Sequence, residues 1–119
     1  MGKVTVDIEL CGKRKCKVFR NVVVDTGAMV SVIPESVARS LGMDITRSKG
    51  LARFIDGREF KVLFAIGEVR IKGVPIPETF ALIKGCKEIV IGLTTLEKGG
   101  FIVDPEKGEL IRREYSIRI

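Results

Sequence analysis

The alternation of apolar and polar side chains predicts that most of the chain forms short strands. Residues 4–10 alternate strictly, which is the two-residue period of a strand with one buried face. Residues 16–24 continue as a second strand, in which the unbroken run Val22 to Val24 predicts burial on both faces. Further strands are predicted at residues 51–54, 59–63, 65–71, 79–83, 88–91, 101–104, 109–112 and 116–119, with Gly73, Pro75, Pro77 and Gly85 as breaks.

Turn residues predict two hairpins and two short helices. Asp56-Gly57 is a strong signal for a two-residue turn, because both positions favour positive φ, so residues 51–63 are expected to form a hairpin with an exposed tip. A second hairpin turns at residues 105–108. Pro34 opens a helix over residues 35–41, Gly42 closes it, and another helix follows Gly92 over residues 93–98. The first helix is expected to bury Val37, Ala38 and Leu41.

These elements and the length of 119 residues predict a single domain, residues 1–119, that is mainly β. The chain is 45% apolar and 30% charged, without a long apolar tract or a charged leader, so we expect a soluble, cytoplasmic protein without a membrane span. It has no histidine. This excludes Ser-His-Asp and Cys-His catalysis and histidine-containing zinc sites, and leaves carboxylates, Lys, Cys and Tyr as reactive groups.

The three cysteines are odd in number and form no Cys-x-x-Cys pair. This pattern fits neither a disulfide framework nor a structural zinc site, so Cys11, Cys16 and Cys86 are expected to be structural thiols, with no metal. The scarcity of amide side chains, with no Gln and one Asn, resembles the composition of hyperthermophile proteins.

The net charge of +6 raises the alternative of a small basic β-barrel that binds nucleic acid. No stacking aromatics or recognition helix accompany the densest basic run, so a solvated hairpin tip is the favoured interpretation and no nucleic acid is expected. That run consists of Lys13, Arg14, Lys15, Lys17 and Arg20.

A carboxylate at the end of a strand that is predicted to be buried needs an explanation, because an unpaired buried charge is costly. Asp25 follows the run Val22 to Val24, and Thr26 and Gly27 follow Asp25. An ordinary tight turn is one explanation. The context favours another: Ala28 and the apolar residues 30–33 lead into a helix, and residues 88–92 open a second helix further along.

This ordered set resembles the retropepsin family, the retroviral-type (clan AA) aspartic proteases, in a single-domain prokaryotic or archaeal form. The match spans Val18 to Glu109. The resemblance implies a retropepsin-like acid protease barrel with one or two short helices, which is half of a pepsin-type fold, assembled as a symmetric dimer. It makes Asp25 the catalytic aspartate, Thr26 the residue whose hydroxyl locks two active-site loops together, and Gly27 a point of close approach to substrate.

The same resemblance makes the predicted hairpin at 51–63 a flap over the substrate. Substrate contacts are then expected from Ala28, Met29, Arg53, Phe54, Ile55, Asp56, Gly57 and Arg58, and support behind the site from Val24, Ile91 and Gly92. The apolar character of this set predicts apolar side chains around the cleaved bond, with Arg53 or Arg58 favouring acidic residues further out.

Hydrolysis by carboxylates alone requires one ionised and one protonated group, and the sequence has no second Asp-Thr-Gly or Asp-Ser-Gly. The second carboxylate is therefore expected from Asp25 of another copy, which predicts a homodimeric aspartic endopeptidase that needs no cofactor. The alternative is a weak or inactive peptide-binding or dimerisation module. Intact Asp25 and Thr26 favour the enzyme.

Two positions depart from many retroviral members. Met29 and Leu93 stand where those proteins carry an Asp and an Arg that form an ion pair, and the joint change predicts a packed apolar contact. Residues 116–119 are compatible with a sheet shared between protomers and with a free terminal strand.

Overall fold

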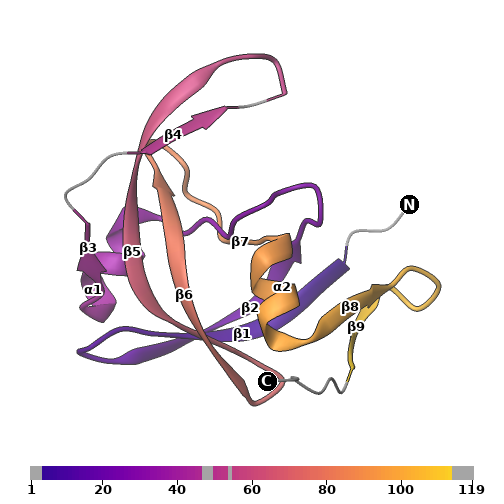
Figure 1. Cartoon of the computed structure of the whole chain (residues 1–119). Helices are drawn as coiled ribbons and strands as arrows, with labels where there is room; N and C mark the ends of the chain where they lie inside the picture. Colours follow the sequence, from indigo (N-terminus) through magenta and orange to yellow (C-terminus); the bar gives the residue numbers. More distant parts are fainter. Residues whose placement is uncertain (1–3, 47–49, 54, 114–119) are drawn as a thin grey trace, which may run out of the picture.

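The computed structural model describes residues 4–46, 50–53 and 55–113, and its fold is mainly β with two short helices (Figure 1). A seven-stranded sheet has the order β3-β5-β1-β2-β7, with β4 and β6 also paired to β5, and a separate hairpin pairs β8 with β9. In chain order the elements are β1 (Val4–Cys11), β2 (Cys16–Val24), α1 (Glu35–Leu41), β3 (Asp44–Ile45), β4 (Gly50–Arg53), β5 (Glu59–Ile71), β6 (Val74–Ile83), β7 (Val90–Ile91), α2 (Leu93–Gly99), β8 (Phe101–Asp104) and β9 (Glu109–Arg112).

The strand β5 is long enough to belong to several parts of the fold. Its first residues pair with β4, its middle with β3, and its last residues with β1, while β6 runs antiparallel along most of its length. Figure 1 shows that β4 and the start of β5 form a hairpin that projects from the body of the molecule. The same strand therefore contributes both to the core and to the projecting hairpin.

The core lies where the apolar positions of the strands meet the two helices. Ile8 and Leu10 of β1 are buried, as the alternation predicts. In β2, Val22 and Val24 are buried and Val23 is half-buried, so the prediction of burial on both faces holds for one face only. The largest fully buried apolar side chains are Phe80, Leu10, Ile33, Leu41, Ile71, Ile76, Ile91, Leu96 and Val69.

The predicted helices are confirmed. α1 has the predicted bounds, with Ala38 and Leu41 fully buried and Val37 half-buried. It ends at Gly42, whose φ of 78° is a left-handed conformation that glycine adopts at low cost. α2 extends one residue beyond the prediction, to Gly99. The described part of the chain contains no helix that is long and apolar enough to span a membrane.

Several strands between residues 44 and 91 differ from the prediction. Residues 59–71 form one strand rather than two, β7 is shorter than predicted, and β3 was not predicted. β6 passes through Pro75 and Pro77, which were expected to break it. Ala81 of β6 donates its N–H to the Ser31 carbonyl and not to β5, and the register with β5 is unbroken, so Pro75 and Pro77 also have their nitrogen atoms on the edge away from β5. No hydrogen bond between β5 and β6 is therefore lost.

The tip of the β4–β5 hairpin is exposed, as predicted, but its turn is larger. Arg53 pairs with Glu59, so five residues connect the strands, and among Asp56 and Gly57 only the glycine has a positive φ. The Asp56 carboxylate instead accepts a hydrogen bond from the Arg58 N–H at 3.0 Å and so orders the turn locally. The hairpin at residues 101–112 and its turn are confirmed.

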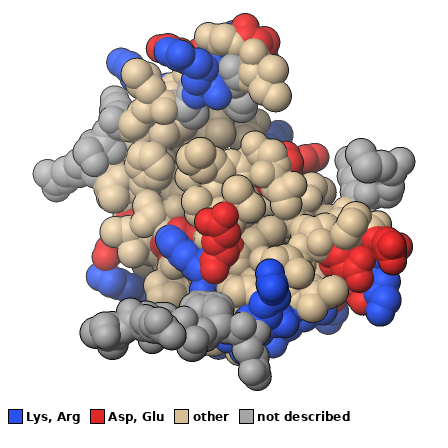
Figure 2. Space-filling view, turned by 45° about the vertical axis from the view of Figure 1, so that its right-hand side comes forward, with Lys and Arg blue, Asp and Glu red and all other residues tan. Residues whose placement is uncertain are grey.

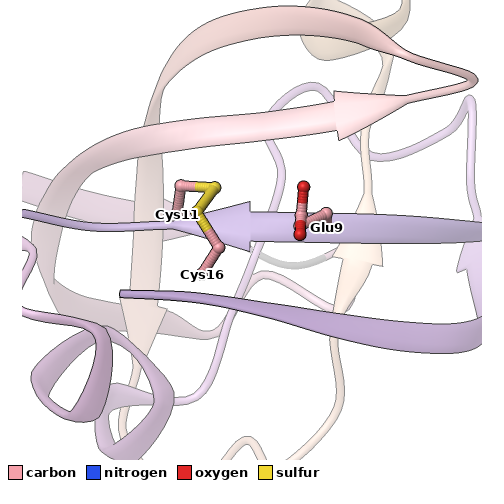
Figure 3. Close-up of side chains that lie close together, drawn as sticks. All are labelled: Glu9, Cys11 and Cys16. Carbon is pink, nitrogen blue, oxygen red and sulfur yellow. A yellow bond between two sulfur atoms is a disulfide. The ribbon is translucent and has the colours of Figure 1, made fainter. Parts of the chain in front are cut away.

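The expectation that all three cysteines are thiols is wrong for two of them. Cys11 and Cys16 are paired directly across β1 and β2, with Cα atoms 4.0 Å apart, and form a disulfide (Figure 3). A sequence separation of five residues gave no sign of this, because the pairing depends on hairpin register. Cys86 is a free thiol, as expected.

The disulfide closes the hairpin that carries the basic run. All five basic side chains of this run are exposed, which confirms the predicted solvated tip. Lys13 forms an ion pair with Asp44 at 2.7 Å, and Arg20 with Asp7 at 3.3 Å. Beside the disulfide, Arg70 bridges β5 and β1, and its hydrogen bond and ion pair with Glu68 raise the pKa of this guanidinium.

Candidate active site

A groove of about 580 Å³ lies between the segment that follows β2, the β4–β5 hairpin, and the inner faces of β5 and β6. We call it the Asp25 groove. Figure 2 shows an area without charged groups between the charged groups at the top of the view and an acidic group near its centre. The lining residues are Asp25, Gly27, Ala28, Met29, Val30, Val32, Leu51, Arg53, Ile55, Val62, Phe64, Ala81 and Ile83.

Asp25 lies immediately after β2, and its position is set by backbone contacts on both sides. Its N–H donates to the carbonyl oxygen of Ile91 at 2.9 Å, and its own carbonyl accepts from the Ala28 N–H at 3.1 Å. Its carboxylate Oδ1 accepts from the Gly27 N–H at 2.9 Å. The side chain is exposed in the single chain, so the expectation of a buried charge is wrong. Asp25 lies past the buried end of β2 and lines the groove.

The segment behind Asp25 is held by β7 and the start of α2. β7 runs parallel to β2 and places Ile91 beside Val24, with both side chains buried. Val32 exchanges two backbone hydrogen bonds with Val90, each 2.9 Å long. These contacts connect both ends of residues 25–33, which we call the Asp25 loop, to one short strand.

Gly92 has no space for a side chain. A Cβ there would lie 2.5 Å from the carbonyl oxygen of Val30 and 2.8 Å from that of Ala28. The next residue, Leu93, donates its N–H to the Ala28 carbonyl at 2.8 Å. The predicted supporting residues Val24, Ile91 and Gly92 therefore all lie directly behind the Asp25 loop.

The residues predicted on the hairpin divide into two groups. Arg53 and Ile55 line the groove, whereas Asp56, Gly57 and Arg58 lie at the tip and do not. Phe54 lies outside the described residues. Both arginines are in ion pairs within the hairpin: Arg53 with Glu59 at 2.6 Å and Arg58 with Asp56 at 2.5 Å.

Thr26 is exposed, and within the described part of the chain its hydroxyl forms no hydrogen bond. The next positions on this side are also open: Met29 is 72% exposed, Val30 41% and Leu93 37%. The Thr94 N–H donates to the Met29 carbonyl at 3.0 Å, which places the two segments side by side. The apolar contact between Met29 and Leu93 stays a prediction.

Several lining residues were missed by sequence analysis. Leu51, Val62, Phe64, Ala81 and Ile83 come from three strands, and their apolar alternation is the same signal that marks a core position. The sequence does not distinguish these groove positions from core positions, because the difference arises only from the way the β4–β5 hairpin projects from the sheet. The groove contains one acidic residue, Asp25, and one basic residue, Arg53, among the described positions.

A possible metal-ligand cluster lies elsewhere. The ligand atoms of Glu9, Cys11 and Cys16 are within 4.8 Å of one another (Figure 3). The two sulfur atoms are joined in the disulfide and are not thiolates, and Glu9 is in an ion pair with Arg70. This cluster has no part in the Asp25 groove.

Comparison with known proteins agrees with this geometry. Residues 17–98 match the model of the family described as "gag-polyprotein putative aspartyl protease". The chain belongs to this family of retropepsin-like aspartic proteases. The solution structure of simian foamy virus (mac) protease is similar, with a TM-score of 0.54 and 14% sequence identity over 78% of this chain and 91% of that one. At this identity the likeness shows the retropepsin-like fold alone. No curated protein sequence matches the chain.

Proposed function

We propose that the protein is an aspartic endopeptidase whose active site forms between two copies of the chain, each contributing Asp25. The observation that carries the proposal is the placement of Asp25, held by backbone hydrogen bonds at the edge of an apolar groove in which it is the one acidic residue among those described. A single carboxylate cannot act as general acid and general base in the same step. A second copy of the chain, related by a twofold axis beside Asp25, therefore supplies the second carboxylate.

In this mechanism one Asp25 carboxylate takes a proton from a water molecule, and the water oxygen attacks the peptide carbonyl carbon. The other Asp25 is protonated and donates its proton to the carbonyl oxygen, which gives a neutral tetrahedral diol. The Asp25 that took the water proton then donates it to the leaving nitrogen, a hydroxyl proton of the diol passes to the other Asp25, and the C–N bond breaks. The mechanism needs one protonated and one ionised carboxyl, so activity is expected to fall at a pH that leaves both ionised.

The substrate is a peptide in extended conformation, with apolar side chains on either side of the cleaved bond. The groove walls from β4, β5 and β6 are apolar, and Arg53 is already paired with Glu59. The β4–β5 hairpin acts as a flap whose strands pair with the substrate backbone. The exposed Thr26, Met29 and Leu93 lie in the contact between the two copies, where Thr26 gains a hydrogen-bond partner.

The deciding experiment compares wild type with Asp25→Asn in cleavage of a peptide library. We expect the variant to lose at least ~10²–10⁴-fold in kcat/KM, the range supplied by general acid–base catalysis. The control is Asp44→Asn, which removes an exposed carboxylate paired with Lys13 and is expected to retain wild-type activity. Wild type that binds peptides but never cleaves them would instead favour the binding module, and equal cleavage by Asp25→Asn would refute the mechanism.

A further inference from the structure

Three buried polar side chains form a continuous chain of hydrogen bonds that begins in the Asp25 loop and runs into the protein behind it. Ser31, Glu78 and Thr95 are the buried polar or charged residues among those described. They come from the Asp25 loop, from β6 and from the first turn of α2, and they contact one another. The Ser31 and Thr95 hydroxyl oxygens are 2.5 Å apart, and the Thr95 hydroxyl lies 2.7 Å from Glu78 Oε2.

The direction of this chain follows from the number of protons available. A carboxylate only accepts, so the single Thr95 hydroxyl proton is donated to Glu78. The Ser31 hydroxyl must then donate to Thr95. Ser31 Oγ in turn accepts a hydrogen bond from the Gly92 N–H at 2.9 Å. Each hydroxyl thus donates once and accepts once, in the order Gly92, Ser31, Thr95, Glu78.

The far end of the chain is fixed by charge and by the backbone. Glu78 Oε1 accepts from Lys98 Nζ at 2.6 Å and from the Thr79 N–H at 2.9 Å. The carboxylate is almost fully buried, at 4% side-chain exposure, whereas half of Lys98 is exposed. A buried carboxylate with several donors is held in one orientation, because losing any donor leaves an unsatisfied charge.

The near end of the chain reaches the backbone that holds Asp25. Gly92 directly follows Ile91, whose carbonyl accepts the Asp25 N–H. The Gly92 N–H, held by Ser31, and the Ile91 carbonyl, held by Asp25, belong to the same peptide group. Any rotation of this peptide group therefore moves both hydrogen bonds together.

We propose that Glu78, acting through Thr95 and Ser31, is a positioning residue that fixes the Ile91–Gly92 peptide group and so sets the orientation of Asp25. The role in catalysis rests on the proposed function. The geometric part does not, because it concerns a hydrogen-bond chain within one copy of the protein. Coupled hydrogen bonds strengthen one another in a low-dielectric interior, so the chain transmits the loss of one member to the peptide group at its end.

The first test is the pair Thr95→Val and Thr95→Ser. Valine has nearly the volume of threonine but has no hydroxyl, so it breaks the chain without opening a cavity, whereas serine restores the hydroxyl. We expect Thr95→Val to lower kcat ~10-fold, the scale of a small misplacement of a reacting group, with KM changed less than twofold. Thr95→Ser should stay within twofold of wild type. A Thr95→Ser variant as impaired as Thr95→Val would show a packing role and overturn the proposal.

The second test does not depend on enzymatic activity. Amide hydrogen exchange measured by NMR at Gly92 and Asp25 is expected to be ~10-fold faster in Thr95→Val than in wild type, because both N–H groups depend on the same peptide group. Ser31→Ala, which breaks the chain at its other hydroxyl, should give the same result if Thr95→Val does not fold. The control Thr5→Val makes the same change at an exposed position of β1 and should alter neither amide.

The two tests separate the proposals. Faster exchange at both amides in a protein that cleaves no peptide would support the hydrogen-bond chain and reject the protease. Unchanged exchange at both amides in Thr95→Val and Ser31→Ala would overturn the chain whether or not the protein is an enzyme.

Discussion

Gly92 lies where the Asp25 loop leaves no space for a side chain, and it shows how a single residue determines the site. Its φ of −95° is open to any residue, so backbone conformation is not the reason for glycine. The reason is the close approach of the Val30 and Ala28 carbonyls. Asp25 is similar, because its position comes from the backbone N–H and carbonyl groups around it and not from the carboxylate alone.

Gly92→Ala is expected to lower the free energy of unfolding by about 1–3 kcal/mol, the usual cost of overpacking a tight contact. Activity should fall as well, because the Asp25 loop must move away from the added methyl group. Urea unfolding and kcat/KM measure the two effects.

The control is Gly85→Ala, which adds the same methyl group at a positive φ with no atom within 4 Å. It should cost roughly 1 kcal/mol through backbone strain and leave kcat/KM unchanged. Equal effects of the two substitutions on activity would contradict the interpretation of Gly92.

Ile55 offers a prediction for the β4–β5 hairpin. It is fully exposed and lines the groove, so Ile55→Ser should leave the unfolding midpoint within experimental error and lower kcat/KM for apolar peptides about 10-fold, since a bound substrate buries part of this side chain. Ile102→Ser removes an exposed isoleucine from β8, outside the groove, and should leave kcat/KM unchanged.

At the scale of elements, the hairpins contain both clear agreement and clear differences between the predicted and the observed structure. The hairpin at residues 101–112 follows the sequence pattern, whereas the β4–β5 turn has five residues although Asp56-Gly57 predicted two. Lys72 and Gly73 form the two-residue turn with positive φ at both positions, at 50° and 80°. Lysine gives no turn signal, and of the two turn residues only Gly73 was predicted as a break.

The Cys11–Cys16 disulfide is expected to stabilise the β1–β2 hairpin. A loop of this length corresponds to about 2 kcal/mol of lost chain entropy in the unfolded state. Cys11→Ser/Cys16→Ser should lower the free energy of unfolding by that amount, measured in urea without reductant.

Cys86→Ser is the control and should have no effect, because Cys86 is a free thiol. Thiol labelling of the unfolded, unreduced protein should modify one cysteine. Three labelled cysteines would show that the disulfide does not form.

At the scale of the whole molecule, the proposed site is incomplete in one copy. Positive and negative groups are interspersed over the face in Figure 2, which does not favour a continuous nucleic-acid surface there. Disulfides are rare in cytosolic proteins of mesophiles but common inside hyperthermophiles. A disulfide is therefore compatible with the predicted cytoplasmic location if the protein comes from a hyperthermophile, as its composition suggests. The extent of the domain, residues 1–119, also stays a prediction.

Subunit mixing tests the shared site. If each site needs one Asp25 from each copy, and subunits exchange freely, activity should follow the square of the wild-type fraction when wild type is mixed with Asp25→Asn at constant total concentration. Light scattering should give a mass of twice 13.1 kDa for each protein. Activity proportional to the wild-type fraction itself would show a site complete within one chain.

The sequence alone determined the local features: the alternation in β1, the bounds of α1, the hairpin at residues 101–112 and the Asp25-Thr26-Gly27 motif with its downstream partner Ile91-Gly92. Each depends on neighbours within a few residues or on a short motif, whose physical preferences hold in any context. The tertiary structure alone decided the continuity of β5, the tolerance of Pro75 and Pro77, the Cys11–Cys16 disulfide, the exposure of Asp25 and the buried chain from Gly92 to Glu78. These depend on which distant segments become neighbours, since strand register and edge position determine which N–H groups, sulfur atoms and carboxylates meet.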